Sequence, residues 1–195
     1  MKSIVTVYMT LLIAVSGAAN AAPVSYQIDP AHTFPSFEAD HMGISLWRGK
    51  FNKTVGNLVL DKAASTGTVE VEVEIDSVDF GLDTMHEQAV SSAFFDSAQY
   101  PKALYKGRLV DFVDGAPTRL NGELTLHGVT RPLDLTINLF KCIPHPMLKR
   151  ELCGADASAT FQRDAFGLTA GKDYGFNMDV NLRIQMEAVQ GGLHP

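Results

Sequence analysis

The stretch LNGELTLHGVTRPLDLTINLF, residues 120–140, decides the fold of this chain. Apolar and polar residues alternate from Leu120 to His127, and the alternation resumes at Leu133. Between these runs, Gly128 can adopt backbone angles closed to other residues, and Pro132 cannot donate a hydrogen bond to a sheet. The stretch therefore predicts a β-hairpin with one apolar face, in which the interval from Gly128 to Pro132 forms the turn.

The N-terminal residues predict a signal peptide over positions 1–21. Lys2 gives a positive start, and residues 4–15 form an apolar run of about signal-peptide length. Residues 19–21 are a small-x-small site, so we expect cleavage before Ala22 and export to the periplasm. The alternative is a retained membrane anchor, which needs roughly 20 apolar residues. Polar residues interrupt the run, so we expect no stable membrane insertion.

The remainder, residues 22–195, suits a single domain. The whole chain carries 16 basic and 22 acidic side chains, and removal of Lys2 makes this balance more acidic. An acidic balance argues against a nucleic-acid partner. Cys142 and Cys153 are the two cysteines. In an exported chain they predict a disulfide that staples a loop, and two buried free thiols are the alternative.

Alternation with a period of two recurs along the mature chain. It predicts strands over 35–41, 47–60, 69–75, 103–109, 155–161 and 176–188. A helix is expected from a capping box at Thr84 and Glu87 to about Ala93. About eight antiparallel strands with one or two short helices leave an all-β sandwich or a closed barrel. Glycines inside the long strands favour the curved option, an extended antiparallel β-barrel.

No residue pattern predicts catalysis or metal binding. The histidines show no pair at the spacing of a metal site: His32, His41, His86, His127, His145 and His194. No nucleophile motif is present, and paired cysteines are not nucleophiles. His41 shares a strand face with Phe37 and Ala39, so it could bond the polar end of a ligand. A histidine satisfied by backbone groups at the barrel rim is an equal alternative.

The apolar interior is the remaining candidate site. A barrel of about eight strands is either filled by side chains or holds one small ligand. Several inward positions are small, which leaves space: Ala39, Ala103, Gly107, Gly122 and residues 155–159. Such a cavity would suit a long hydrocarbon with a polar head, whereas a fully packed core is the alternative. We expect the ligand-binding residues to be Phe37, Ala39, His41, Val71, Val73, Tyr105, Leu124, Leu126, Leu135, Ile137, Phe176, Met178, Val180 and Leu182.

Several motifs in combination resemble the YceI family of bacterial periplasmic proteins. They cover nearly the whole mature chain: Tyr26-x-Ile28-Asp29 with His32, His41-Met42-Gly43 with Gly49-x-Phe51, Phe94-Phe95-Asp96 with Tyr100-Pro101, residues 122–132, and Arg163-x-x-Phe166-Gly167-Leu168. The resemblance implies a lipocalin-like extended barrel whose hydrophobic tunnel binds a polyisoprenoid or an isoprenoid quinone such as ubiquinone, with no other cofactor. The family often carries Arg-Asp-x-His-Leu where this chain has residues 85–89, Met-His-Glu-Gln-Ala. The cysteines resemble those of a subset of the family.

Three hypotheses for the function follow. The first is a periplasmic binding or carrier protein for an isoprenoid lipid or quinone, without covalent chemistry. The second is a redox enzyme or partner that uses bound quinone or haem, with His41 or His86 as acid, base or ligand. The third is a packed barrel that acts as a protein-interaction module. The sequence identifies no protein partner.

Overall fold

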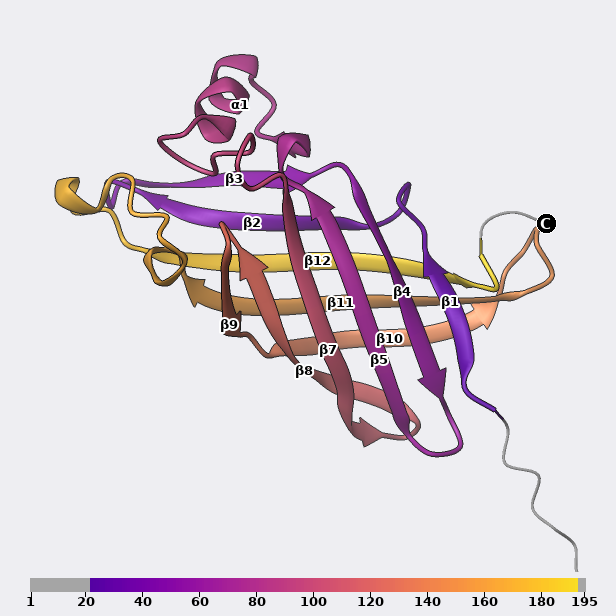
Figure 1. The fold of residues 1–195 in the computed structure, drawn as a ribbon. Coiled ribbons are helices and arrows are strands. Elements are labelled where there is room, and N and C mark those ends of the chain that lie inside the picture. The colour runs from indigo at the N-terminus through magenta and orange to yellow at the C-terminus, as the bar shows by residue number, and fades with distance from the viewer. Residues whose placement is uncertain (1–21, 193–195) are drawn as a thin grey trace, which may run out of the picture.

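The structure, a computed structural model, describes residues 22–192 (Figure 1). The predicted signal peptide at 1–21 lies outside these residues. Within the described range, no helix is both long and apolar enough to cross a membrane.

Eight antiparallel strands close into a barrel, which confirms the predicted fold class. Each strand pairs with the next around the ring, and the ring closes where Ile28 faces Ala188. The inward faces of the strands bury a continuous apolar core. In ring order the strands are β1 (Val24–Ile28), β4 (Thr54–Asp61), β5 (Thr66–Glu74), β7 (Lys102–Val113), β8 (Ala116–Leu126), β10 (Leu135–Pro144), β11 (Glu151–Gln162) and β12 (Asp179–Gln190).

The barrel is extended at one end because β12 serves two partners. Its last residues pair with β1, whereas its first half pairs with β2 (Phe34–His41). β3 (Ser45–Phe51) adds to β2, and the short β6 (Val78–Asp79) adds to β3. The helix α1 (Asp83–Val90) lies over β3 at this end, and the tip of the β10–β11 hairpin lies at the opposite end (Figure 1). Three 3-10 turns complete the fold: η1 (Ile75–Ser77), η2 (Arg163–Phe166) and η3 (Lys172–Tyr174).

The turn of the central hairpin is shorter than the sequence predicts. The two residues His127 and Gly128 make it, with φ of 51° and 74°. The following β9 (Val129–Pro132) returns along β8 from Leu126 to Glu123, so most of the predicted turn is strand. Two positive φ angles match the twist of a tight hairpin, and histidine tolerates this conformation better than most residues. Pro132 ends the short strand, where a missing N–H is tolerated.

A β-bulge changes the register of β10. The pairing with β11 shifts between Ile137 and Leu139, and this inserts one extra residue into the strand. Leu139, expected on the apolar face, is 62% exposed, whereas Phe140 takes the inward position. A slip of one residue exchanges the two faces of a strand, so the alternation predicts the wrong side beyond this point.

The predicted disulfide is present, but the surrounding segment is not an irregular loop. Cys142 and Cys153 lie directly opposite each other on β10 and β11 and are bonded. The strands continue to Pro144 and resume at Glu151, so only residues 145–150 form a loop. The prediction failed because Pro144 occupies a strand end, where proline is tolerated.

The helix also differs from the prediction. It begins after Leu82, which makes no side-chain capping bond, and it ends at Val90 rather than near Ala93. Thr84 lies inside the first turn, so the expected capping box does not form. The packing of Ala89 against the apolar cluster of Phe37, Val78 and Val180 instead holds the helix in place.

Candidate functional site: an apolar cavity with one exposed end

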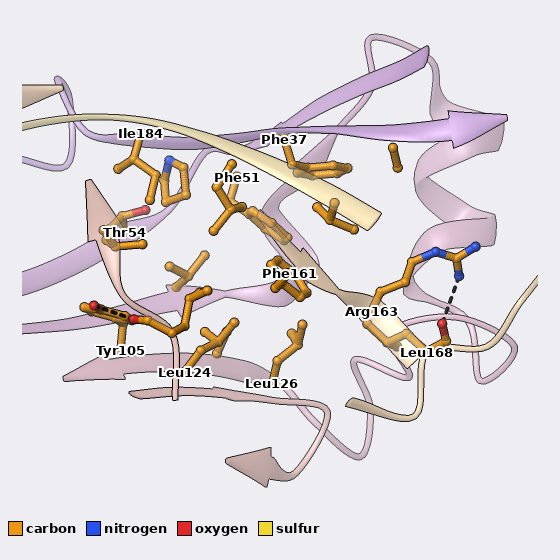
Figure 2. Close-up of a pocket in the computed structure, with 18 of the residues that line it drawn as sticks. Phe37, Phe51, Thr54, Tyr105, Leu124, Leu126, Phe161, Arg163, Leu168 and Ile184 are labelled. Carbon is orange, nitrogen blue, oxygen red and sulfur yellow. Dashed lines mark hydrogen bonds between the residues drawn. The ribbon is translucent and has the colours of Figure 1, made fainter. Parts of the chain in front are cut away.

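The barrel encloses a cavity of about 550 Å³ (Figure 2). Side chains from the barrel strands form its wall, and Phe80, Met85, Ala89 and Phe95 close one side. The volume is typical of a pocket for a small organic ligand. The interior is therefore not filled by side chains, and the packed-core alternative is wrong for this chain.

The structure places nearly all of the predicted site residues on the wall of this cavity. Those that line it are Phe37, Ala39, His41, Val71, Val73, Tyr105, Leu124, Leu126, Leu135, Ile137, Phe176, Val180 and Leu182. Met178 is buried but lies outside the wall. It precedes β12, which begins at Asp179, so the alternation of the strand does not fix its direction. That these side chains contact a ligand remains a prediction.

Aromatic rings that the sequence reasoning did not select form one side of the cavity. The Phe51 ring lies 5.7 Å from Phe37 and 5.9 Å from Phe95, centroid to centroid. Phe80 meets Phe37 edge to face at 5.6 Å, and Phe161 lines the wall beside them (Figure 2). Phe161 lies in the alternating run 155–161, which could have identified it. Phe80 and Phe95 lie outside regular strands, so no periodicity marks them.

The small residues that were expected to leave space in the barrel have two different roles. Alanines 39, 103, 155 and 157 line it, as expected. Gly107 and Gly122 do not, because they accommodate Tyr105 instead. A Cβ atom at Gly122 would lie 2.5 Å from the Tyr105 hydroxyl oxygen, and one at Gly107 would lie 2.9 Å from the Tyr105 ring. These glycines therefore let an aromatic ring pack flat against the sheet.

Few polar groups reach the cavity. The Tyr105 hydroxyl donates to the carbonyl of Leu133 at 2.9 Å (Figure 2), and burial raises the pKa of this tyrosine. Thr33 Oγ1 donates to the carbonyl of Glu187 and accepts from its N–H. Among residues 22–192, Thr54 Oγ1 is the buried side-chain oxygen or nitrogen that has no hydrogen-bond partner. The wall therefore favours an apolar ligand over a charged one.

One end of the cavity is exposed. Three residues that line the cavity are also exposed: Trp47, Gln88 and Tyr174. They belong to the β2–β3 hairpin, to α1 and to the 170–176 segment, each of which contributes to the wall of the cavity. The His41 ring stacks on Trp47 at 4.1 Å and meets Phe176 edge to face at 5.3 Å. The structure thus places His41 at the rim, packed by aromatic rings.

Arg163 lies on the wall near this end, and the sequence reasoning did not select it as a site residue. Its Nη1 donates to the carbonyl of Leu168 at 2.9 Å (Figure 2). Its Nη2 donates to the carbonyl of Ala170 at 2.6 Å. Burial lowers the pKa of Arg163, whereas the negative charges of Asp164 and Asp40 act to raise it. The guanidinium therefore holds the 168–170 loop against the barrel mouth. The motif that begins at Arg163 was the available signal.

The other residues that the sequence singled out lie in different surroundings. His86 lies outside the cavity wall, and its Nδ1 lies 2.9 Å from the carbonyl oxygen of Val78. Met85 and Gln88, from the segment that departs from the family pattern, line the cavity. Among the described residues, the cluster with metal-ligand spacing is Cys142, Glu151 and Cys153, and its thiols are bonded to each other.

Comparisons with known proteins agree with this fold. The family model of the YceI-like domain matches residues 26–188. A UPF0312 protein of Pectobacterium atrosepticum is 29% identical over 191 residues, which cover 97% of each chain. The crystal structure of a Campylobacter jejuni YceI protein is 23% identical with a TM-score of 0.65, and the match covers 78% of this chain and 90% of that one.

A further solved structure shares the fold at low sequence identity. It is a domain of Saccharophagus degradans described as polyisoprenoid binding and implicated in plant cell wall breakdown. It is 16% identical with a TM-score of 0.61, and the match covers 86% of this chain and 99% of that domain. With the family model matched over almost the whole described barrel, the chain belongs to the YceI-like domain family.

Proposed function

We propose that this chain is a periplasmic carrier that holds an isoprenoid lipid or isoprenoid quinone in its barrel. The observation that carries this proposal is the apolar cavity of about 550 Å³, whose exposed lining residues lie together at one end. Burial of a hydrocarbon chain in such a cavity is favourable by roughly 0.8 kcal/mol for each CH₂ group. The polyisoprenoid-binding relative of the same fold supports the choice of ligand class.

The periplasmic part of the proposal has two supports. The first residues have the pattern of a signal peptide, and Cys142 and Cys153 are joined in a disulfide. Disulfides persist in oxidising compartments such as the bacterial periplasm and are rare in the cytosol. We propose binding without covalent chemistry; among residues 22–192, the two threonines of the cavity wall bond no histidine or carboxylate side chain.

Lipid extraction tests the proposal directly. The exported protein is purified without detergent, extracted with organic solvent and analysed by mass spectrometry, with added ubiquinone as a second probe. We expect an isoprenoid lipid at near-stoichiometric yield. Ala157→Phe should greatly reduce this yield, because Ala157 lines the cavity and the larger side chain occupies the ligand's space.

Thr160→Phe is the matched control, since Thr160 is exposed on the same strand. It should leave the yield unchanged. Absence of any lipid from the wild type, together with no uptake of added quinone, would refute the carrier proposal. A coloured protein whose turnover of quinone disappears in His41→Ala would instead support the redox alternative.

A further inference from the structure

Exposed apolar side chains gather around the open end of the cavity. At the tip of the β2–β3 hairpin, the exposed fraction is 55% for Met42, 79% for Ile44 and 47% for Leu46. Trp47 and Tyr174 are exposed by 38% and 82% and also line the cavity. We call these five residues the apolar collar. Because two of its members belong to both surfaces, the collar is continuous with the cavity wall.

The hairpin tip and the 171–177 segment form one unit. The Asp40 carboxylate accepts hydrogen bonds from the N–H of Gly43 at 3.0 Å and from the N–H of Asn177 at 3.0 Å. The rings of His41 and Phe176 meet at 5.3 Å. The hairpin that carries Met42 is therefore anchored beside the segment that carries Tyr174.

The turn at the tip uses a residue that its backbone does not favour. Met42 and Gly43 have φ of 59° and 70° in the three-residue turn between the paired residues His41 and Ser45, and a positive φ is uncommon for methionine. Met42 is 55% exposed, so its side chain does not belong to the buried core. Positions that break a local rule are expected at functional or strained sites.

The collar carries no formal charge. Residues 41–47, His-Met-Gly-Ile-Ser-Leu-Trp, contain no lysine, arginine, aspartate or glutamate. Arg48, which follows, is paired with Glu38 at 2.7 Å. A neutral apolar surface does not select a charged partner, whereas tryptophan and tyrosine are enriched where proteins meet the membrane interface.

We propose that the apolar collar docks this protein on the surface of a lipid bilayer. The proposal rests on the proposed function, because a bilayer both covers the collar and contains the hydrophobic ligand. Docking places the mouth of the cavity against the lipids, so that the ligand passes between membrane and barrel without crossing water. Since the collar is neutral, zwitterionic phospholipid suffices.

The single tryptophan of the chain makes the test specific, because Trp47 is in the collar. The mature protein is mixed with phosphatidylcholine vesicles, and binding is measured by flotation and by Trp47 fluorescence. We expect co-flotation and a blue shift that change little between about 50 and 500 mM salt. Brominated phosphatidylcholine should quench the fluorescence.

The collar variant is Met42→Asn with Ile44→Thr; both residues lie in the turn, and asparagine tolerates the positive φ at position 42. It should lower the vesicle partition coefficient by about tenfold or more. The matched control is Met147→Asn with Leu139→Thr, because these residues are 81% and 62% exposed and lie outside the collar. The control should bind vesicles as the wild type does.

Four outcomes would overturn the docking proposal. They are no vesicle binding by the wild type, equal loss in both variants, binding only to anionic vesicles with a steep salt dependence, and self-association that the collar variant alone abolishes. The last would make the collar an interface between two copies, which analytical ultracentrifugation detects. If lipid co-purifies but vesicles do not bind, the carrier function stands and the docking proposal fails.

Discussion

Two buried threonines of the cavity differ in one respect, their hydrogen bonds. Thr33 and Thr54 are 2% and 1% exposed, and only Thr33 has partners. We predict that Thr54→Val raises the free energy of unfolding by about 1 kcal/mol, because it removes a hydroxyl that was desolvated without a partner. Thr33→Val should lower it by roughly 1 to 3 kcal/mol, since it leaves the N–H of Glu187 without its acceptor, while the carbonyl of Glu187 keeps the bond from the N–H of Asp29. Urea unfolding measures both, and equal effects would contradict the assignment.

A carboxylate distant from the cavity mouth couples stability to pH. Glu151 accepts hydrogen bonds from the Tyr26 hydroxyl and from Lys62 Nζ, the latter at 2.5 Å. Burial acts to raise the pKa of Glu151, but the bonds from Lys62 and Tyr26 and the charge of Lys62 outweigh it and hold the pKa below its usual value. The folded protein therefore binds fewer protons at this site than the unfolded chain, and the stabilisation is present above the unfolded pKa of about 4.3.

We predict that Glu151→Gln removes this dependence. At neutral pH the wild type should exceed the variant by roughly 0.5 kcal/mol in free energy of unfolding, a small value because the pair is partly exposed. The difference should fall as the pH drops below about 4.3 and through the folded pKa. Unfolding curves between about pH 3 and pH 7 measure it, and a constant difference would show that Glu151 acts by packing.

The site residues that the sequence predicted correctly lie where strand alternation fixes a direction, although Phe161 in such a run was not selected. Phe37, Ala39 and His41 face the cavity together because a strand repeats every two residues. Arg163 and Phe95 lie in turns, where direction depends on contacts that no local pattern records. His41 was predicted only in part. The alternation of its strand places it on the correct face, but it does not predict the contacts of its ring with Trp47 and Phe176.

At the scale of elements, the central hairpin has a turn that can be tested. Gly128 and Gly115 both have positive φ, 74° and 80°. A Cβ atom at Gly128 would lie 2.7 Å from the Tyr100 ring, whereas nothing lies within 4 Å of one at Gly115. We predict that Gly115→Ala costs roughly 1 kcal/mol of stability and Gly128→Ala clearly more. Thermal and urea unfolding of both variants compare them, and equal costs would show that Tyr100 does not limit the turn.

Alternation predicted most strands, but it did not predict where they are interrupted. The bulge after Ile137 inserts a residue without changing the composition of the segment, so the pattern beyond it points to the wrong face. His127 is not among the preferred turn residues, and the run from Val129 to Pro132 was too short to be recognised as a strand. These features depend on pairing with neighbouring strands, which a local pattern does not contain.

For the whole molecule, the proposed ligand should stabilise the barrel. A ligand that binds only the folded state adds about 2.7 kcal/mol at 100 times its dissociation constant. We predict that added ubiquinone raises the unfolding temperature of the wild type and that Ala157→Phe loses this increment. Differential scanning calorimetry measures both. The same increment in Ala157→Phe would place the bound quinone outside the cavity.

Which strands close the barrel and how large its cavity is lay beyond local sequence reasoning. Ile28 pairs with Ala188 across almost the whole chain, and no periodicity states which strands meet. Periodicity also shows which side chains point inward but not whether they fill the space. The cavity depends on the twist of the whole sheet and on long-range contacts such as that of Tyr105 with Gly107 and Gly122, which no local pattern records.

For the proposed carrier, the exposed end of the cavity has a consequence for the order of events during transport. A hydrocarbon chain that enters and leaves by this end reverses its path, so the part that enters last departs first. A lipid with one polar head enters tail first if its head is to stay near water, and its head is then the first part that an acceptor meets. The polar rim residues Gln88 and Asp40 would face that head during both loading and delivery.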